Sequence, residues 1–326
     1  AKVESKVIDG STANQKIINI NIEEKATGEI SAGAGVGTSG TTVSFGVKEN
    51  NFQGKGVKLN TNVAIATDTL QGTFSITVPN YKYSNNSLTT SLERTQIDKL
   101  TINGYKTART GIGIGTGFEQ YENFYFTPSL NILNEKVETN SSASANYKKQ
   151  EGSYFDTDFS YGLTYDVRDQ GFQPTEGYKT SFYQTVPIIS DDFSIVNQFQ
   201  FNSYKELFND MIGSFSFYAK TVNSLQGNDV RVSKRIFLPT SKLRGFERSK
   251  IGPKDGTDYV GGNYATAINL STTLPNFLPT LQNTDFKLFI DAANVWGVDY
   301  SESIDNSSKI RSSTGVSIDW FTPLGP

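Results

Sequence analysis

Residues 155–167, FDTDFSYGLTYDV, alternate between apolar or aromatic side chains and polar ones. Phe155 and Phe159 share one face of this run, whereas Asp156 and Asp158 lie on the other. Successive side chains of a β-strand point to opposite faces of a sheet, so a period of two residues indicates a strand. The stretch therefore predicts a strand in a sheet that is apolar on one face and wet on the other.

The same alternation continues along most of the chain. Leu288 and Ile290, for example, share a face from which Lys287 and Asp291 point away. We expect about fourteen such strands. They are predicted at residues 28–38, 42–52, 55–69, 71–80, 87–99, 105–119, 123–138, 153–168, 177–187, 193–206, 211–224, 259–274, 284–296 and 309–322.

The lengths of the strands and of their connections favour a membrane barrel. Short turns, such as residues 169–171, alternate with longer polar segments, such as residues 139–152, which is typical of a barrel with long loops at one end. Runs of about ten residues or more match the thickness of a bilayer, and aromatic residues such as Tyr121, Trp320 and Phe321 lie near their ends. We therefore predict an all-β, antiparallel transmembrane β-barrel. A soluble all-β repeat or lectin-like protein is the alternative.

Composition excludes several kinds of chemistry. The 326 residues include no cysteine and no histidine, so disulfides, thiolate catalysis and a Ser-His-Asp hydrolase are impossible. The net charge of -3 argues against a nucleic-acid partner. The sequence contains no run of about 18 apolar residues, so no membrane helix is predicted. We expect neither an enzyme nor a bound cofactor or metal ion.

The first 27 residues differ from the rest. Residues 2–9 and 16–25 alternate as two strands around a turn, but lysine and glutamate line them and aromatic residues are missing. Two strands are too few to fold alone. We therefore expect residues 1–27 to be the remnant of a soluble domain that begins before Ala1, and residues 28–326 to be the barrel.

A long segment, residues 226–260, separates two predicted strands. Loops of this length are uncommon in compact domains and usually have a function. Because the segment contains Ile236, Phe237 and Leu238, we expect it to fold back into a protected space. A short motif follows these apolar residues: Leu243, Arg244, Gly245, Phe246 and Glu247.

Arg244 is the strongest candidate for a site residue. A guanidinium group keeps its charge, so a desolvated arginine requires anionic or carbonyl acceptors. Asp291 alternates with Ile290 and Ala292 and should point into the lumen, where a bidentate pair would fix the loop inside the barrel. A solvated loop arginine and an ordinary lumen aspartate form the alternative.

The first predicted barrel strand is the second candidate site. It carries Gly28, Ile30, Gly33, Gly35 and Gly37 with alanines between the glycines. Glycine weakens a strand, and a weak strand at the barrel seam could open sideways and pair with an incoming strand. Crowding in the lumen that requires small residues is the competing explanation.

Other charged groups have simpler interpretations. We expect the basic pairs at residues 148–149 and 234–235 to be solvated or to face lipopolysaccharide. Two acidic pairs, Asp191 with Asp192 and Asp156 with Asp158, could hold calcium in principle, but ordinary lumen acidity is the preferred interpretation. The glycine-rich residues 111–115 follow strand periodicity, so they do not indicate a nucleotide site.

Several segments together resemble the BamA family, the central subunits of the bacterial outer-membrane β-barrel assembly machinery. The resemblance keeps its order over nearly the whole chain. It rests on residues 28–31, 47–56, 235–238 with 243–247, 261–263, 291–296 and 311–326.

The resemblance implies both a fold and a function. Family barrels have sixteen strands, so the closing strands would follow residue 326 and this chain would be truncated. The implied function is insertion of β-barrel proteins into the outer membrane of a Gram-negative bacterium through a lateral gate. Implied partners are unfolded outer-membrane protein clients, accessory lipoproteins that bind missing periplasmic (POTRA-like) repeats, and lipid or lipopolysaccharide. The family commonly has a glutamate where Ser271 aligns, so Arg244 is expected to use other partners here.

Three other functions stay open at this point. A two-partner-type secretion pore of the same superfamily would export a polypeptide through its lumen. A passive porin would need an open lumen, which conflicts with an apolar loop inside it. An outer-membrane protease or phospholipase would have to work without histidine.

Overall fold

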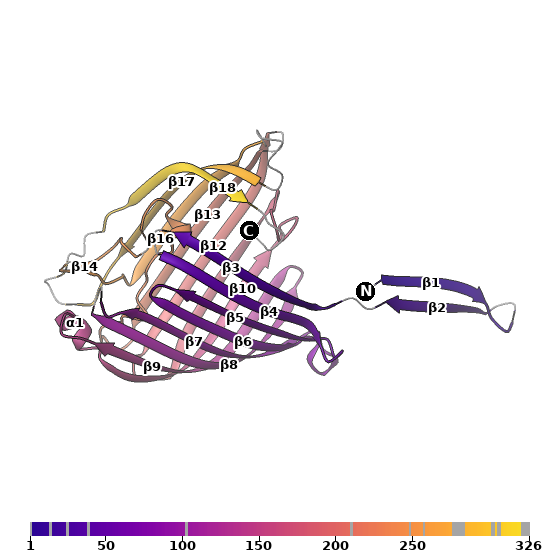
Figure 1. The fold of residues 1–326 in the computed structure, drawn as a ribbon, viewed down its shortest axis with the longest axis horizontal. Coiled ribbons are helices and arrows are strands. Elements are labelled where there is room, and N and C mark those ends of the chain that lie inside the picture. Colours follow the sequence, from indigo (N-terminus) through magenta and orange to yellow (C-terminus); the bar gives the residue numbers. More distant parts are fainter. Residues whose placement is uncertain are drawn as a thin grey trace.

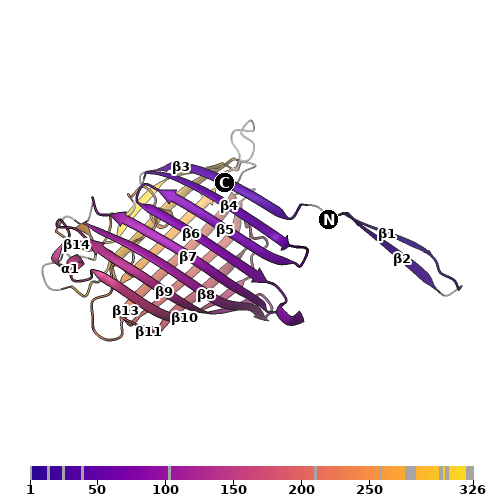
Figure 2. The same ribbon diagram turned by 60° about the horizontal axis from the view of Figure 1, so that its bottom comes forward.

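The fold is seen in a computed structural model, which describes residues 2–12, 15–23, 26–37, 40–101, 104–208, 211–247, 249–256, 258–275, 284–300, 304 and 308–320. A single antiparallel sheet of 14 strands dominates it. The strands lie obliquely side by side and the sheet curls around a lumen (Figures 1 and 2). The predicted all-β barrel architecture is confirmed.

Each predicted run corresponds to one strand of the sheet. The strands are β3 (Gly28–Gly37), β4 (Gly40–Phe52), β5 (Val57–Ala66), β6 (Thr69–Val78), β7 (Ser87–Lys99), β8 (Tyr105–Tyr121), β9 (Phe124–Thr139), β10 (Gly152–Asp166), β11 (Gly177–Ser190), β12 (Ser194–Phe208), β13 (Met211–Ser224), β16 (Tyr264–Thr273), β17 (Thr284–Trp296) and β18 (Arg311–Trp320). Neighbours in the chain are neighbours in the sheet, with β13 pairing β16 across the long loop. One boundary was wrong, because the run expected from residue 259 begins as a strand only at Tyr264.

The two faces of the sheet differ as the alternation predicts. Ile112, Ile114 and Ile290 are exposed on the outer face, in positions suited to contact hydrocarbon. Asp156 and Asp291 lie on the inner face and are fully buried. An apolar outer surface around a charged interior is the arrangement of a transmembrane barrel rather than of a soluble sandwich.

The sheet has two edges within the described residues. β3 pairs only with β4, and β18 pairs only with β17. Phe321, one of the predicted girdle aromatics, lies outside the described residues. The unpaired backbone of β3 is therefore one end of the ladder.

A two-stranded hairpin precedes the sheet and projects from it (Figure 1). It consists of β1 (Lys2–Asp9) and β2 (Lys16–Glu23), as predicted from the sequence. Val3, Val7, Ile18 and Ile22 share one face, and each is at least 60% exposed. An isolated hairpin with an uncovered apolar face is marginal in water, so this element needs a covering surface.

The loops at the opposite end from the hairpin are longer (Figure 1). They include α1 (Ala145–Lys148), which the sequence analysis did not expect, and the two-residue strands β14 (Lys254–Asp255) and β15 (Asp258–Tyr259). The hydroxyl of Ser144 accepts a hydrogen bond from the Tyr147 backbone and caps α1. Two 3-10 turns, η1 (Tyr81–Tyr83) and η2 (Thr240–Lys242), complete the elements.

No helix in the part of the chain that the structure describes is long and apolar enough to span a membrane.

Candidate functional site

The connection between β13 and β16, residues 225–263, folds into the lumen and forms an apolar core with the barrel wall. Its apolar side chains pack against small or aliphatic residues of three neighbouring strands. The buried cluster contains Val230, Ile236, Leu238, Leu243 and Ile251 from the loop and Tyr218, Val222, Ala265, Ala267, Ala293 and Val295 from β13, β16 and β17. The expectation that Ile236 and Leu238 find a protected space is met by this packing.

Two glycines let the loop lie this close to the wall. Ile236 and Gly262 exchange backbone hydrogen bonds of 2.8 and 3.0 Å. A Cβ atom on Gly262 would approach the backbone oxygen of Trp296 to 2.6 Å, so a larger residue would push the loop off β17. Gly245 has a φ of 81°, a conformation that residues with a Cβ adopt only at a cost.

The structure places Arg244 against Asp291. Nε and Nη2 of Arg244 donate hydrogen bonds of 2.8 and 2.6 Å to the two carboxylate oxygens, and the backbone N–H of Arg244 donates a third of 2.9 Å. Asp291 is completely buried, whereas the Arg244 side chain is 27% exposed. This bidentate geometry is the strong form of an arginine–carboxylate pair.

Three further groups complete the environment of this pair. The amide nitrogen of Asn269 donates to Asp291 at 2.8 Å and to the backbone oxygen of Lys242 at 3.0 Å. The ring of Phe289 lies 3.8 Å from the guanidinium carbon of Arg244. Ser271 is not part of the site, since its hydroxyl lies 2.7 Å from that of Ser214. Asn269 therefore supplies the second partner of the carboxylate in this chain.

The rest of the motif is divided between the core and the solvent. Leu243 is buried and Phe246 packs against the same cluster. Glu247 is half exposed and forms a loose ion pair of 3.6 Å with Lys250. The apolar residues and the arginine of the motif thus pack against the barrel wall, whereas its glutamate stays exposed.

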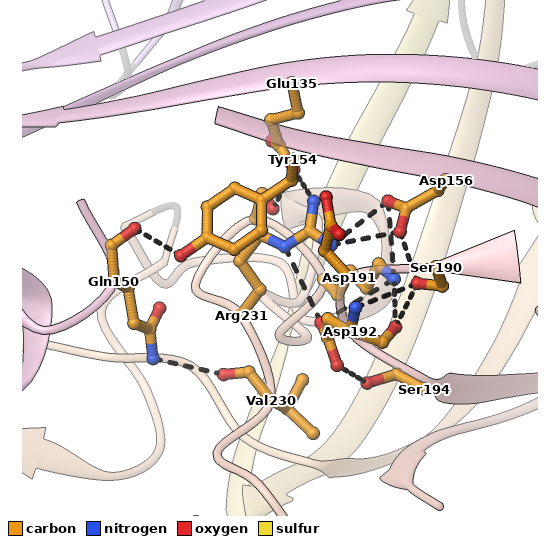
Figure 3. Close-up of polar contacts among 12 residues, drawn as sticks. Glu135, Gln150, Tyr154, Asp156, Ser190, Asp191, Asp192, Ser194, Val230 and Arg231 are labelled. Carbon is orange, nitrogen blue, oxygen red and sulfur yellow. Dashed lines mark hydrogen bonds and ion pairs between the residues drawn. The ribbon is translucent and has the colours of Figure 1, made fainter. Parts of the chain in front are cut away.

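Arg231, a buried arginine of the same loop, was not among the predicted site residues (Figure 3). Its Nη1 donates to Glu135 at 2.8 Å, and its Nη2 donates to both oxygens of Asp156 at 3.1 and 3.2 Å. Nε lies 3.6 Å from a carboxylate oxygen of Asp192. The guanidinium group also stacks on the ring of Tyr154 at 4.0 Å. Arg231 is only 2% exposed, so three carboxylates surround a desolvated cation.

Neighbouring polar groups fix this cluster. The side-chain amide of Gln150 donates a hydrogen bond to the Val230 backbone at 3.4 Å (Figure 3). It also accepts one from the Val232 backbone at 2.7 Å, so it holds the loop on both sides of the arginine. Lys234 adds a second cation, with its Nζ 3.6 Å from both Asp156 and Asp192. Burial alone would lower the pKa of Arg231, but the carboxylates outweigh burial and raise it, so the cation persists.

These contacts correct one interpretation from the sequence. Lys234 and Arg235 are not a solvated basic patch, because Arg235 is buried, stacks on Tyr300 at 4.2 Å and donates to Asn263 at 3.1 Å. Asp156 and Asp192 bind cationic side chains. The described residues contain no group of three or more acidic, histidine or cysteine side chains arranged to hold a metal ion.

The two arginines attach the loop to different parts of the barrel. Arg231 binds carboxylates from β9, β10 and the turn after β11. Arg244 binds β17, next to the last described strand. The loop therefore crosses the lumen and connects the wall at β9 and β10 with the wall at β17, an arrangement called here a strut.

The space around the glycines of β3 bears on the two explanations for them, a weak strand or a crowded lumen. A Cβ atom on Gly35 would meet no atom within 4 Å, and one on Gly33 would meet only the flexible hydroxyl of Ser44. Crowding does not require glycine at position 35. Ile30 is 72% exposed on the outer face of the same strand. No described residue crowds position 35, and the weakness of the strand stays a prediction.

Substituting Gly35 with alanine tests this explanation. Because the added methyl group has space and alanine restricts the unfolded chain, the variant should be more stable by roughly 0.5–1 kcal/mol in urea unfolding. Gly46→Ala is the control, since its Cβ would lie 2.6 Å from the Ser31 hydroxyl and should not stabilise the barrel. Loss of stability in Gly35→Ala would instead support crowding.

Comparison with known proteins identifies the family. Residues 51–326 match the Omp85 superfamily domain. The chain belongs to the Omp85 superfamily. Its curated matches include BamA proteins. Two curated relatives are the outer membrane protein assembly factors BamA of Neorickettsia risticii, 24% identical over 99% of this chain, and of Neisseria meningitidis, 23% identical over 97%.

Solved structures of this superfamily share the fold. BamA from Haemophilus ducreyi lacking POTRA domains 1-3 superimposes with a TM-score of 0.83 at 23% identity, covering 100% of this chain and 70% of that one. CdiB from Escherichia coli gives a TM-score of 0.58 at 11% identity, covering 98% of this chain and 61% of that one. This Omp85 chain is an integral β-barrel of the bacterial outer membrane. It spans 44% and 45% of the lengths of the two curated relatives.

Proposed function

We propose that this Omp85 chain is the barrel part of a factor that inserts β-barrel proteins into the outer membrane. The observation that carries the proposal is the free edge of β3, a glycine-rich strand with a hydrogen-bonded neighbour on one side only among the described residues. The names of the BamA relatives, which cover almost the whole of this chain, support it. Its substrates would be unfolded outer-membrane proteins.

The mechanism is backbone pairing without covalent chemistry. An edge strand presents N–H and C=O groups that an extended client strand can satisfy, which is β-augmentation. Because unpaired backbone groups are costly in hydrocarbon, a client strand gains most by pairing there. A weak β3 would release its seam partner and accept the client at a low cost.

The anchored loop has a supporting role in this proposal. Its two arginines connect the wall of β9 and β10 with that of β16 and β17. The strut would keep the lumen closed and hold the wall in shape while the seam opens. A polypeptide-secretion pore, the rival function, would have to remove this loop from the lumen and break both charged contacts.

The N-terminal hairpin belongs to the same proposal. We assign residues 1–27 to the end of a periplasmic, POTRA-like repeat, because the exposed apolar face of β1 and β2 needs the rest of a domain to cover it. Accessory lipoproteins would bind such repeats.

Site-specific photocrosslinking tests the proposed function. A photoreactive amino acid at Ile30 on β3 should trap a client barrel protein during its assembly in cells. The control position is Val47, the register partner of Ile30 on β4, which also faces outward but already has two strand neighbours. Strong client adducts at position 30 and few at position 47 are expected. Equal adducts at both positions, or none at position 30 under active assembly, would contradict strand templating.

A further inference from the structure

The outer face of the sheet is hollowed near the end that carries the hairpin. A cavity of about 560 Å³ is hollowed into it across β12, β13, β16, β17 and β18. Its apolar lining includes Phe215, Leu270, Leu288 and Ile290, all of them exposed outward. This volume lies within the range of ligand sites in proteins.

The cavity exists because small residues interrupt the apolar outer surface. Gly213 pairs with Lys205 on one side and with Thr272 on the other, and Thr272 pairs with Leu288. Gly213 contributes no side chain to the outer face, and the side chain of Leu207 covers it, so Leu207, Phe215 and the leucines of β16 and β17 form the walls of a groove.

One end of the groove is cationic. Lys205 lines it, is exposed, and forms no ion pair with any described residue. Phe215 belongs to a row of neighbouring rings, tilted relative to one another, with Phe201 and Tyr178, at centroid distances of 6.0 and 5.8 Å. Aromatic belts mark the depth of the membrane interface, and a lysine near such a belt lies at the level of the lipid headgroups.

We propose that this groove binds a phospholipid with an anionic headgroup, whose phosphate pairs with Lys205 and whose acyl chain lies between Phe215 and Leu288. Charge complementarity at one end, an apolar trough at the other and a face that contacts lipid favour this occupant. Such binding depends on the membrane location of the barrel and is independent of the proposed assembly function.

Tryptophan fluorescence in lipid vesicles tests the proposal. In a Trp296→Phe, Trp320→Phe background, Phe215→Trp places a reporter in the groove. Quenching of this tryptophan should show that the groove binds brominated phosphatidylglycerol about fivefold more tightly than brominated phosphatidylcholine. A fivefold ratio corresponds to one lysine–anion contact. A reporter at Ile112, on the outer face of β8 away from the groove, should show no such preference.

Two substitutions decide whether the groove causes the preference. Lys205→Gln should abolish the preference, whereas Lys58→Gln, a matched change of charge outside the groove, should leave it intact. Gly213→Leu should reduce quenching by both lipids, because its Cβ would lie 2.8 Å from the Leu207 side chain and push that side chain into the groove. Folding of each variant is checked by its heat-modifiable migration on gels. Equal quenching by the two lipids, a preference that survives Lys205→Gln, or tighter binding of lipid A than of phosphatidylglycerol would overturn the proposal.

Discussion

Replacing Arg231 with glutamine should destabilise the barrel by about 3–5 kcal/mol. The substitution leaves the buried carboxylates of Glu135, Asp156 and Asp192 close together, with Lys234 as the remaining cation within ion-pair distance among the described residues. The free-energy cost of their mutual repulsion and lost hydrogen bonds is larger than the net stability that the original contacts contribute. Urea unfolding of the detergent-folded barrel measures the effect.

The control for this prediction lies in the same loop. Lys250→Gln removes an exposed ion pair and should change the stability by less than about 1 kcal/mol. Adding Glu135→Gln to Arg231→Gln should restore part of the lost stability, because one buried charge is removed. If Arg231→Gln were as mild as Lys250→Gln, the buried cluster could not be an anchor of the loop.

Replacing Arg244 with alanine should release the middle of the loop while leaving the sheet folded. Asp291 would lose its cationic partner in a fully buried position and keep only neutral donors among the described residues, the Asn269 amide and the backbone N–H of residue 244. A cost of roughly 3 kcal/mol corresponds to about a hundredfold increase in the open population, so proteinase K should cleave the loop about a hundredfold faster. We also expect impaired assembly of client barrels in cells.

A double substitution separates the ion pair from simple truncation. Arg244→Ala with Asp291→Asn removes the uncompensated charge and should be cleaved more slowly than Arg244→Ala alone. Arg244→Lys should be intermediate, since an ammonium group cannot form the bidentate contact. Unchanged cleavage in all three variants would show that packing of Leu243 and Phe246 alone holds the loop.

The strands could be predicted from the sequence because each one carries its own signal. Residues 155–167 and 286–296 alternate with a period of two whatever their neighbours are, and the 14-stranded sheet follows from such local patterns. The start of β16 was placed too early because residues 259–263 look strand-like. In the structure Gly262 instead pairs with Ile236 inside the loop.

The site could be predicted only in part, because a sequence shows local patterns and not which distant positions meet. Arg244 stands in a recognisable motif and Asp291 alternates with Ile290, so each had a local signal. The Arg231 cluster joins positions 135, 156, 192 and 231, and nothing in the sequence states that these positions meet. A weak signal existed in the arginine between Val230 and Val232, because a charge between two buried valines needs a partner.

An engineered disulfide between the loop and the wall tests the central claim that the loop is anchored inside the lumen. The chain has no cysteine, so any new bond is unambiguous. A Cβ atom at position 245 would lie 3.9 Å from the Cβ of Ser313, within the range of disulfides. Gly245→Cys with Ser313→Cys should therefore form a disulfide in intact outer membranes, whereas Gly245→Cys with Ser317→Cys, roughly 13 Å further along β18, should not. Free thiols in the first pair, or equal oxidation of both pairs, would contradict a loop fixed in this position.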